Sequence, residues 1–372
     1  MPIIAASGQQ PLVGALEPSL QATVVCPECH GNLLNCSISP DDIEQIVPAS
    51  VQDQEFSCLL RCENCARSFP VLAEGIPLLW SDALRNSFDH HETSQCRDNA
   101  SEEDVKAANI YVYDEILDDY EHKSVHGDRN TFSRLEHAVS LIHFTGPGRH
   151  LDVGCGPGNI LAATSTAKFP VKIGCDISLT ALRSASSKGF PAVLGDAERL
   201  PFASDQFNLI TAYSVLHHLF DPCRFVKEAY RTLADSGGLI TDYDPNKMAG
   251  NLGWLAIWLY RMRNRIYSAA PFLAKRRVKI DSEETRRLND IAEFQNGPGR
   301  GFVMAELERD LSNAGFQVQC ALAHNTTQAD LNTRSKTKPR LRHVVTQSLS
   351  LRNPMNRKYA DTLLTVSTKP GE

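Results

Sequence analysis

The chain of 372 residues is 42% hydrophobic and 22% charged, with a net charge of −6, which is typical of a globular protein of more than one domain. No apolar run reaches the ~18 residues of a membrane span, and the first residues lack a basic signal-peptide start, so we expect neither feature. The eleven cysteines are an odd number and include two pairs with metal-ligand spacing, which favours a reducing cytoplasm over a disulfide framework.

Two Cys-x-x-Cys pairs stand near the N-terminus with 32 residues between them, Cys26 with Cys29 and Cys62 with Cys65. Each pair supplies two thiolates from a tight turn, so together the pairs predict a tetrahedral zinc site. Flanking cysteines (Cys36 and Cys58) are alternative ligands. Ordinary free thiols are the competing interpretation, and a redox pair is disfavoured because no βαβ pattern surrounds either motif.

A run that reads Phe-Pro-Val-Leu-Ala-Glu-Gly-Ile-Pro-Leu-Leu follows the second pair at residues 69–79. With the two cysteine pairs, it resembles the small zinc-ribbon proteins that serve as activator subunits of methyltransferases. The resemblance implies a zinc-ribbon domain over residues 22–80 that is structural and partner-binding, fused here to its client. Residues 81–106, polar and acidic, are predicted to be a linker.

Two amphipathic stretches, residues 107–120 and 132–144, predict helices before the first strand of the next domain. Three tyrosines of the first stretch are candidates to contact a cofactor or substrate: Tyr111, Tyr113 and Tyr120. The alternative is a half-buried aromatic stripe without a role in binding.

The sequence Leu-Asp-Val-Gly-Cys-Gly-Pro-Gly at residues 151–158 predicts a buried strand, a tight turn and the start of a helix. Its Gly-x-Gly-x-Gly spacing differs from the dinucleotide fingerprint and resembles the nucleotide loop of class I S-adenosylmethionine (SAM)-dependent methyltransferases. Strands and helices alternate after it, which predicts an α/β fold with a doubly wound parallel sheet. The resemblance implies a seven-stranded Rossmann-like sheet with helices on both faces over residues 107–369, with inserts at about 247–300 and 325–358.

Two carboxylates follow predicted strands of this domain. Asp176 ends the second strand about 20 residues past the glycine loop, where it can accept ribose hydroxyls, although a plain helix N-cap is the alternative. Asp196 lies in a Gly-Asp-Ala-x-x-Leu-Pro-Phe run that resembles the methyltransferase motif whose Asp holds the adenine amino group. The resemblance implies a cofactor-binding set of Asp152, Gly154, Cys155, Gly156, Gly158, Asp176, Ile177, Asp196, Ala197 and Tyr213.

The run Val-Leu-His-His-Leu at residues 215–219 matches the signature of the large SAM methyltransferase group that includes ubiquinone and menaquinone biosynthesis enzymes. Because imidazole titrates near neutral pH, His217 and His218 are candidates for a general base. The alternative is that the pair packs against a helix and only borders the cofactor.

The inserts are basic: residues 251–358 hold 19 of the 38 Lys and Arg but 9 of the 44 Asp and Glu. An aromatic stretch with Trp254 and Trp258 runs into Arg261, Arg263 and Arg265, and a second basic segment spans residues 334–358. We consider a lid over a hydrophobic acceptor, peripheral membrane contact through residues 251–279, and an RNA-binding surface. A packed helix with a solvated basic end is an equally simple interpretation.

The leading functional hypothesis is a cytoplasmic methyltransferase with SAM as cofactor and a structural zinc, acting on a small-molecule or lipid-like acceptor. The alternative is a methyltransferase of a ribosomal RNA base that binds RNA through the zinc module and the basic inserts. A catalytically silent scaffold that binds a partner through the ribbon is a third hypothesis. The intact glycine loop, Asp176 and Asp196 argue against it, because a silent copy need not retain all three.

Overall fold

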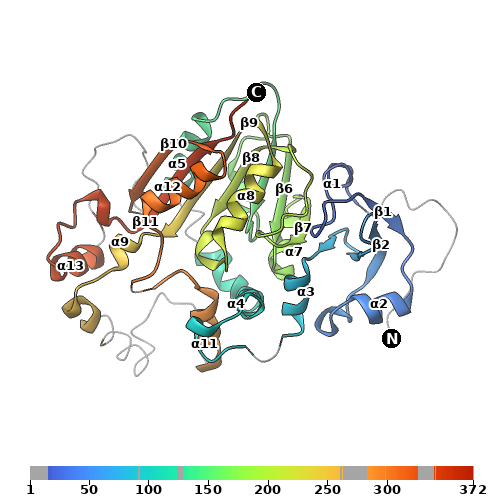
Figure 1. Cartoon of the computed structure of the whole chain (residues 1–372), viewed down its shortest axis with the longest axis horizontal. Coiled ribbons are helices and arrows are strands. Elements are labelled where there is room, and N and C mark those ends of the chain that lie inside the picture. The colour runs from blue at the N-terminus through green and yellow to red at the C-terminus, as the bar shows by residue number, and fades with distance from the viewer. Residues whose placement is uncertain are drawn as a thin grey trace.

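A computed structural model describes residues 16–90, 93–123, 129–259, 262, 283–297, 299–325, 339 and 341–371. It contains a three-stranded sheet near the N-terminus and an eight-stranded sheet that forms the centre of the molecule (Figure 1). This α/β architecture confirms the predicted fold class.

The N-terminal module is an antiparallel sheet of β1 (Leu33–Cys36), β2 (Phe56–Cys62) and β3 (Ser68–Leu72), with β2 in the middle. Helix α1 (Pro18–Gln21) precedes it, and α2 (Pro40–Ile46) and the 3-10 turn η1 (Ala49–Val51) lie between β1 and β2. Ser39 is the N-cap of α2, and Pro40 is its first residue. The side chain of Ser39 accepts a hydrogen bond from the Asp42 amide, and the Asp42 side chain accepts one from the Ser39 amide, which forms a capping box. Buried side chains of this module, among them Leu60 and Phe69, belong to the same hydrophobic cluster as those of Val193 and Leu194 in the large sheet.

The module joins the large sheet through β4 (Leu78–Leu79), which pairs in parallel with β7 (Ala192–Gly195). The eighth strand of the large sheet is therefore supplied by the N-terminal module. Residues 81–106, predicted to be a linker, contain α3 (Asp82–Phe88) and the 3-10 turn η2 (Arg97–Asn99), and α4 (Glu102–Lys123) begins within them.

The large sheet has the strand order β10-β11-β9-β8-β5-β6-β7-β4. Its parallel strands are β5 (Arg149–Val153), β6 (Val171–Asp176), β7, β8 (Phe207–Tyr213) and β9 (Leu233–Pro245). Strand β11 (Thr362–Thr368) runs antiparallel to β9, and β10 (Gln317–His324) runs antiparallel to β11. Without β4 this is the seven-stranded sheet that the sequence predicts.

Neighbouring residues of the central strands pack into different hydrophobic clusters, because successive strand side chains point to opposite faces. Leu209, Ile240 and Leu364 pack with helix α5 (Arg129–Ser140), whereas Ile210 and Leu239 pack in the cluster that includes α8 (Pro222–Thr232). Further helices of this domain include α6 (Asn159–Ala163), α7 (Leu179–Ser187), α11 (Glu283–Ala292) and α12 (Met304–Asn313). Helices α8 and α12 lie together over one face of the sheet (Figure 1).

Helices α9 (Lys247–Gly250) and α13 (Leu341–Leu349), with the 3-10 turn η6 (Arg357–Tyr359), lie at the end of the molecule opposite the N-terminal module (Figure 1). Residues 254–259 are also helical, and Trp254 and Trp258 are 80% and 51% exposed. Among the helices of the described residues, none has the length and hydropathy needed to cross a membrane. Several basic insert residues lie outside the described residues, namely Arg261, Arg263, Arg265 and all of 275–279.

Candidate active site

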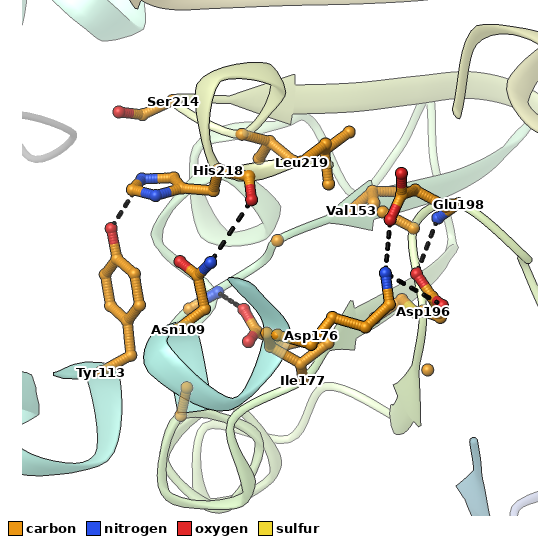
Figure 2. A pocket seen from close by; sticks show the side chains of 18 of the residues that line it. Asn109, Tyr113, Val153, Asp176, Ile177, Asp196, Glu198, Ser214, His218 and Leu219 are labelled. Carbon is orange, nitrogen blue, oxygen red and sulfur yellow. Dashed lines mark hydrogen bonds and ion pairs between the residues drawn. The ribbon is translucent and has the colours of Figure 1, made fainter. Parts of the chain in front are cut away.

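A pocket opens at the carboxyl ends of β5, β6, β7 and β8, where parallel α/β sheets bind their ligands. It encloses about 870 Å³, including its open mouth, and α4 contributes one wall (Figure 2). Its lining comprises Lys106, Asn109, Tyr113, Val153, Gly154, Gly156, Cys175, Asp176, Ile177, Ala181, Gly195, Asp196, Ala197, Glu198, Tyr213, Ser214, Val215, His218, Leu219 and Phe220.

The glycine loop lies at the floor of this pocket, and two of its glycines are required by geometry. Gly154 has φ +62°, and a Cβ there would lie 2.5 Å from Cγ2 of Val215, so only glycine fits. Gly156 has φ +50°, and no heavy atom would lie within 4 Å of a Cβ placed on it. Its main chain therefore faces open space in which a ligand can approach the backbone closely.

Asp176 orients the loop from the end of β6. Its Oδ2 accepts a hydrogen bond from the Gly156 amide at 2.8 Å, and its Oδ1 accepts one from the Ser178 amide at 2.9 Å. Burial raises the pKa of this carboxyl, and the amide donors partly offset the rise. Ser178, not Asp176, is the N-cap of α7, so the N-cap alternative considered for Asp176 is wrong.

A buried network of charges surrounds Asp196 at one end of the pocket. Oδ2 of Asp196 accepts a hydrogen bond from the Ser81 hydroxyl at 2.7 Å, and Oδ1 accepts one from the Glu198 amide at 2.9 Å. The ammonium of Lys106 lies 3.5 Å from Asp196 and 3.2 Å from Glu102, and it also contacts the Glu198 carboxylate. Burial alone would lower the pKa of Lys106, but Asp196 and Glu198 raise it, so the lysine is charged and balances these carboxylates.

The other end of the pocket is formed by His218 and Tyr113 (Figure 2). Nδ1 of His218 lies 2.8 Å from the carbonyl oxygen of Ala292, which requires a proton on Nδ1. Nε2 therefore accepts the hydrogen bond from the Tyr113 hydroxyl, also at 2.8 Å. Burial, reinforced by His217, lowers the pKa of His218 to about 4, so this imidazole is neutral at pH 7.

His217 lies behind the pocket wall and is not among the lining residues. Its Nδ1 is 2.9 Å from Oδ1 of Asp244, and its Nε2 is 3.6 Å from Oε2 of Glu293. Burial lowers the pKa of His217, but the hydrogen bond to Asp244 and the charge of Glu293 outweigh it and raise the pKa. One ligand atom each from His217, His218 and Glu293 lies within 4.8 Å of the others.

Most of the predicted cofactor residues meet in the pocket, and some lie beneath it. Asp152 is buried and accepts a hydrogen bond from the Thr211 hydroxyl at 2.6 Å, and burial raises its pKa to about 8. The Cys155 sulfur packs against Gly174, and Gly158 is the N-cap of α6. The predicted residues that line the pocket are Gly154, Gly156, Asp176, Ile177, Asp196, Ala197, Tyr213 and His218.

Helix α4 supplies pocket residues that the sequence motifs do not mark, above all Lys106 and Asn109. Among the candidate tyrosines of this helix, Tyr113 lines the pocket, whereas Tyr111 is 41% exposed to solvent. The side chain of Tyr120 lies outside the described residues. Tyr113 could be predicted because it is one of the tyrosines of the amphipathic stretch 107–120, whereas no sequence pattern pointed to Lys106.

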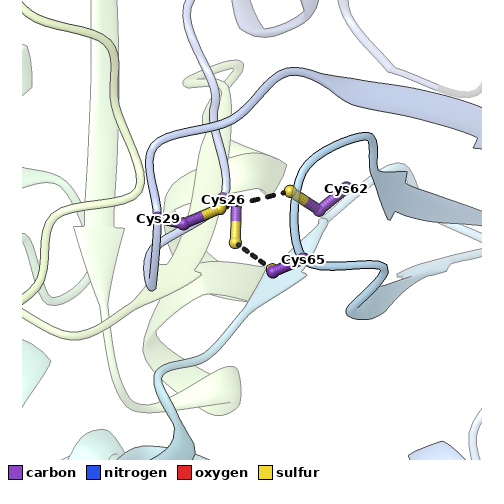
Figure 3. Close-up of side chains that lie close together, drawn as sticks. All are labelled: Cys26, Cys29, Cys62 and Cys65. Atoms are coloured by element: carbon purple, nitrogen blue, oxygen red, sulfur yellow. Dashed lines mark hydrogen bonds between the residues drawn. The ribbon is translucent and has the colours of Figure 1, made fainter.

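The four cysteines of the two Cys-x-x-Cys pairs come together (Figure 3). Sγ of Cys26 lies 3.6 Å from Sγ of Cys65, and Sγ of Cys29 lies 3.4 Å from that of Cys62. A tetrahedron with Zn–S bonds of ~2.3 Å has sulfur–sulfur edges of about 3.8 Å, so the cluster fits zinc. The alternative ligands Cys36 and Cys58 are not part of this cluster.

The two cysteine loops have matching backbones. In the first, the Cys26 amide bonds to the carbonyl of Gly31 at 3.0 Å, and in the second the Cys62 amide bonds to that of Arg67 at 2.8 Å. The residue after each pair, His30 and Ala66, has a positive φ of 54° and 58°. All eleven cysteines lie in described residues and none forms a disulfide.

A comparison with known protein families matches the part of the chain that contains the glycine loop, Asp176 and Asp196. Residues 151–241 match the family model described as a methyltransferase domain. An uncharacterised protein of Methanocaldococcus jannaschii is 25% identical over 168 residues, 45% of this chain and 76% of that protein. The Arabidopsis thaliana tRNA (carboxymethyluridine(34)-5-O)-methyltransferase is 38% identical over 69 residues, 18% of this chain but only 16% of its own length.

Among solved structures, the complex between the Haloferax volcanii Trm112 methyltransferase activator and a methyltransferase is similar, with a TM-score of 0.43 and 16% identity. The match covers 71% of this chain and 97% of that one. The parallel sheet, the glycine loop and the family match define the class: this is a class I SAM-dependent methyltransferase domain. The chain therefore combines a methyltransferase domain, matched over residues 151–241, with a four-cysteine module of the zinc-ribbon type that precedes it.

Proposed function

We propose that this methyltransferase acts on a small-molecule or lipid-like acceptor. The observation that carries the proposal is the end of the pocket that lies between α4 and the 3-10 turn η4 (Leu216–His218). Tyr113, Ser214, His218 and Phe220 line it, so polar atoms and aromatic rings share one wall. A few polar groups in a mostly apolar concavity are typical of small-ligand sites.

The cofactor-binding roles are part of this proposal. Asp176 would accept the ribose hydroxyls of SAM, and Asp196 would accept the adenine amino group, because each carboxylate lies in the pocket at the end of a strand. Gly156 leaves the loop backbone accessible. SAM supplies the methyl group on its sulfonium, and the residues of the chain bring the acceptor into line with it, which accounts for much of the rate.

His218 is the proposed base for the acceptor. It is neutral, and its Nε2 lone pair already accepts a hydrogen bond from the Tyr113 hydroxyl. An acceptor hydroxyl in the place of the Tyr113 hydroxyl would donate to the same lone pair and lose its proton there. Asn109 donates to the carbonyl of His218 at 3.3 Å and helps to hold the turn.

The four-cysteine module would hold one structural zinc, and free thiolate ligands of this kind favour a reducing cytoplasm as the location. Within this proposal residues 22–80 form the zinc ribbon, 81–106 connect it, and 107–369 form the catalytic domain with its two inserts. Elemental analysis of the freshly purified, reduced protein should find one zinc per chain. Less than half an equivalent would contradict the zinc assignment, and Cys62→Ser should remove the metal.

A methyltransferase of RNA is the second candidate, and a specific observation favours it. The Arabidopsis relative acts on tRNA, and residues 251–358 have an excess of basic side chains that suits phosphate binding. RNA affinity would then fall steeply with salt, with a logarithmic slope near −0.7 for each phosphate contacted on a single strand.

The deciding experiment supplies the purified protein with SAM labelled on its methyl group and with fractions of a cell extract. We expect label in the organic-soluble or small-molecule fraction, and loss of that label in His218→Ala. Label in RNA, with tight RNA binding that weakens steeply between two salt concentrations, would overturn the small-acceptor proposal. Asp41→Ala, a change of an exposed helix residue in the N-terminal module, is the matched control.

A further inference from the structure

The hydroxyl group of Ser81, directly after the N-terminal module, contacts a carboxylate that lines the pocket. This residue follows β4 and is the N-cap of α3, where its Oγ accepts a hydrogen bond from the Leu84 amide at 3.1 Å. The same Oγ donates to Oδ2 of Asp196 at 2.7 Å. Both residues are buried, with exposures of 0% and 2%. A hydroxyl has one proton, so the helix cap and the carboxylate together fix its orientation.

Both cysteine loops hold the residue next to Ser81. Glu28 lies between Cys26 and Cys29, and its Oε1 accepts a hydrogen bond from the Asp82 amide at 2.9 Å. Arg67 lies two residues after Cys65, and its guanidinium binds both carboxylate oxygens of Asp82 at 3.1 and 2.6 Å. The first loop thus holds the Asp82 backbone and the second loop holds its side chain.

The first loop also contacts the turn that carries Asp196. The second carboxylate oxygen of Glu28 lies 3.3 Å from Nη1 of Arg199. Arg199 belongs to the turn that follows β7, and its amide donates to the carbonyl of Asp196 at 3.0 Å. Two chains of contact therefore run from the metal-ligating loops to Asp196, one through Ser81 and one through this turn.

We propose that Ser81 is a positioning residue that couples the four-cysteine metal site to cofactor binding. The inference rests on the proposed adenine role of Asp196. When the four thiolates share a metal, Glu28 and Arg67 hold Asp82, and the Ser81 hydroxyl then keeps the Asp196 carboxylate turned toward the adenine amino group. Without that hydroxyl, the ammonium of Lys106, 3.5 Å from Oδ2, draws the carboxylate away.

Coupling between two binding sites is reciprocal: if metal raises the affinity for the cofactor, the cofactor raises the affinity for metal by the same factor. We therefore expect one measurable effect at the cofactor pocket and one at the four-cysteine metal site. Neither needs methyl transfer to be measured, so both are independent of the identity of the acceptor.

The first test measures adenine recognition by calorimetry on the zinc-loaded full chain. The probes are S-adenosylhomocysteine and its inosine analogue, which lacks the exocyclic amino group. In Ser81→Ala we expect affinity for the adenine compound to fall about tenfold, as for a lost hydrogen bond to a charged group, with little change for the inosine compound. A merely structural defect would weaken both compounds equally.

Ser39→Ala is the matched control, because Ser39 is also a helix N-cap in the N-terminal module, with Oγ accepting from the Asp42 amide at 3.2 Å. It should leave the ratio of the two affinities unchanged. In an Asp196→Asn background, Ser81→Ala should have no further effect on that ratio, because the residue acts through Asp196.

The second test measures zinc affinity by competition with a chelator at equilibrium. We expect S-adenosylhomocysteine to raise the zinc affinity of the wild type several-fold and to have a smaller effect in Arg67→Ala. Arg183→Ala is the matched control, since Arg183 is 44% exposed against 41% for Arg67 and pairs with Glu74 instead of Asp82. It should behave as the wild type.

The results distinguish a failure of the proposed function from a failure of the role assigned to Ser81. A wild type that binds neither probe overturns the proposed function itself. A wild type that prefers the adenine compound, with the same preference in Ser81→Ala, overturns the positioning role. If the zinc affinity of the wild type is the same with and without S-adenosylhomocysteine, the coupling between the two sites is contradicted. If Ser81→Ala does not fold, the preference ratio is measured in Arg67→Ala, where a fall that Arg183→Ala does not share supports the inference and no fall contradicts it.

Discussion

The two ends of the pocket are stabilised in different ways. Around Asp196 the contacts are buried and ionic, and Lys106 balances three carboxylates at once. At the other end His218 and Tyr113 form a neutral pair, and the charged partners of His217 lie behind the wall. An ionic network resists rearrangement, because one unpaired buried charge costs several kcal/mol, whereas a neutral hydrogen bond exchanges partners for about 1 kcal/mol. The ionic end therefore suits a ligand that is the same in every reaction. The neutral end suits a ligand whose structure can vary.

The largest expected effect is at the ionic end. Lys106→Met leaves the carboxylates of Glu102, Asp196 and Glu198 without their buried cation, so we expect a loss of about 4 kcal/mol in the free energy of unfolding. Urea denaturation measures it. Lys227→Met, an exposed lysine on α8, is the control and should change stability by less than about 0.5 kcal/mol. Equal effects would show that the ionic end is no more rigid than the surface.

The second-largest effect is expected for Asp176→Ala, as a loss of SAM affinity. Two hydrogen bonds from ribose hydroxyls to a charged group are lost, which corresponds to about a hundredfold loss of SAM affinity. The glycine loop also loses its bond to the Gly156 amide. Isothermal titration of the variant and the wild type measures the difference, and equal affinities would remove Asp176 from the ribose role.

A smaller, pH-dependent effect is expected behind the neutral end. His217→Gln should destabilise by about 2 kcal/mol, because Asp244 loses a buried charged partner. The folded-state pKa of His217 is raised above its unfolded value, so this stability is complete below about pH 6.5 and is lost as pH rises through the folded pKa. Denaturation of both proteins across this range measures it. A difference that grows with pH would contradict the assignment.

The smallest expected effect on folding is that of Tyr113→Phe, which removes one neutral hydrogen bond and should cost about 1 kcal/mol or less. SAM affinity should change little, because the contact lies at the acceptor end. Turnover is the sensitive measurement once an acceptor is known. A loss of SAM affinity as large as that of Asp176→Ala would contradict the division of the pocket into two ends.

The two strand-end carboxylates of the ionic end were predictable from sequence, whereas their cation, Lys106, and the contacts made at the neutral end were not. Asp176 and Asp196 follow strands that lie side by side, and the ends of parallel strands meet at one edge of a sheet. The four zinc-ligand candidates come from two local turns, which spacing alone identifies. Local motifs thus located the carboxylates at two strand ends and the cysteines of two tight turns.

The neutral end depends on contacts between segments far apart in the chain. His218 meets Tyr113 from α4 and the carbonyl of Ala292 from α11, and no local pattern encodes either contact. The sequence also could not separate His217 from His218, because adjacent residues in a 3-10 turn face different neighbours only once that turn is packed. Lys106 escaped notice for the same reason, since helical periodicity does not say which partner covers a face.

Strand β4 is two residues long, yet it closes one edge of the large sheet. Leu78 and Leu79 pair with Leu194 and Gly195, so they cover the outer edge of β7. A bare edge strand exposes unpaired amide and carbonyl groups that recruit another copy of the chain, and proteins suppress such growth by covering their edges. We expect a truncated chain that begins at residue 107 to present this apolar edge and to associate with other copies through strand addition.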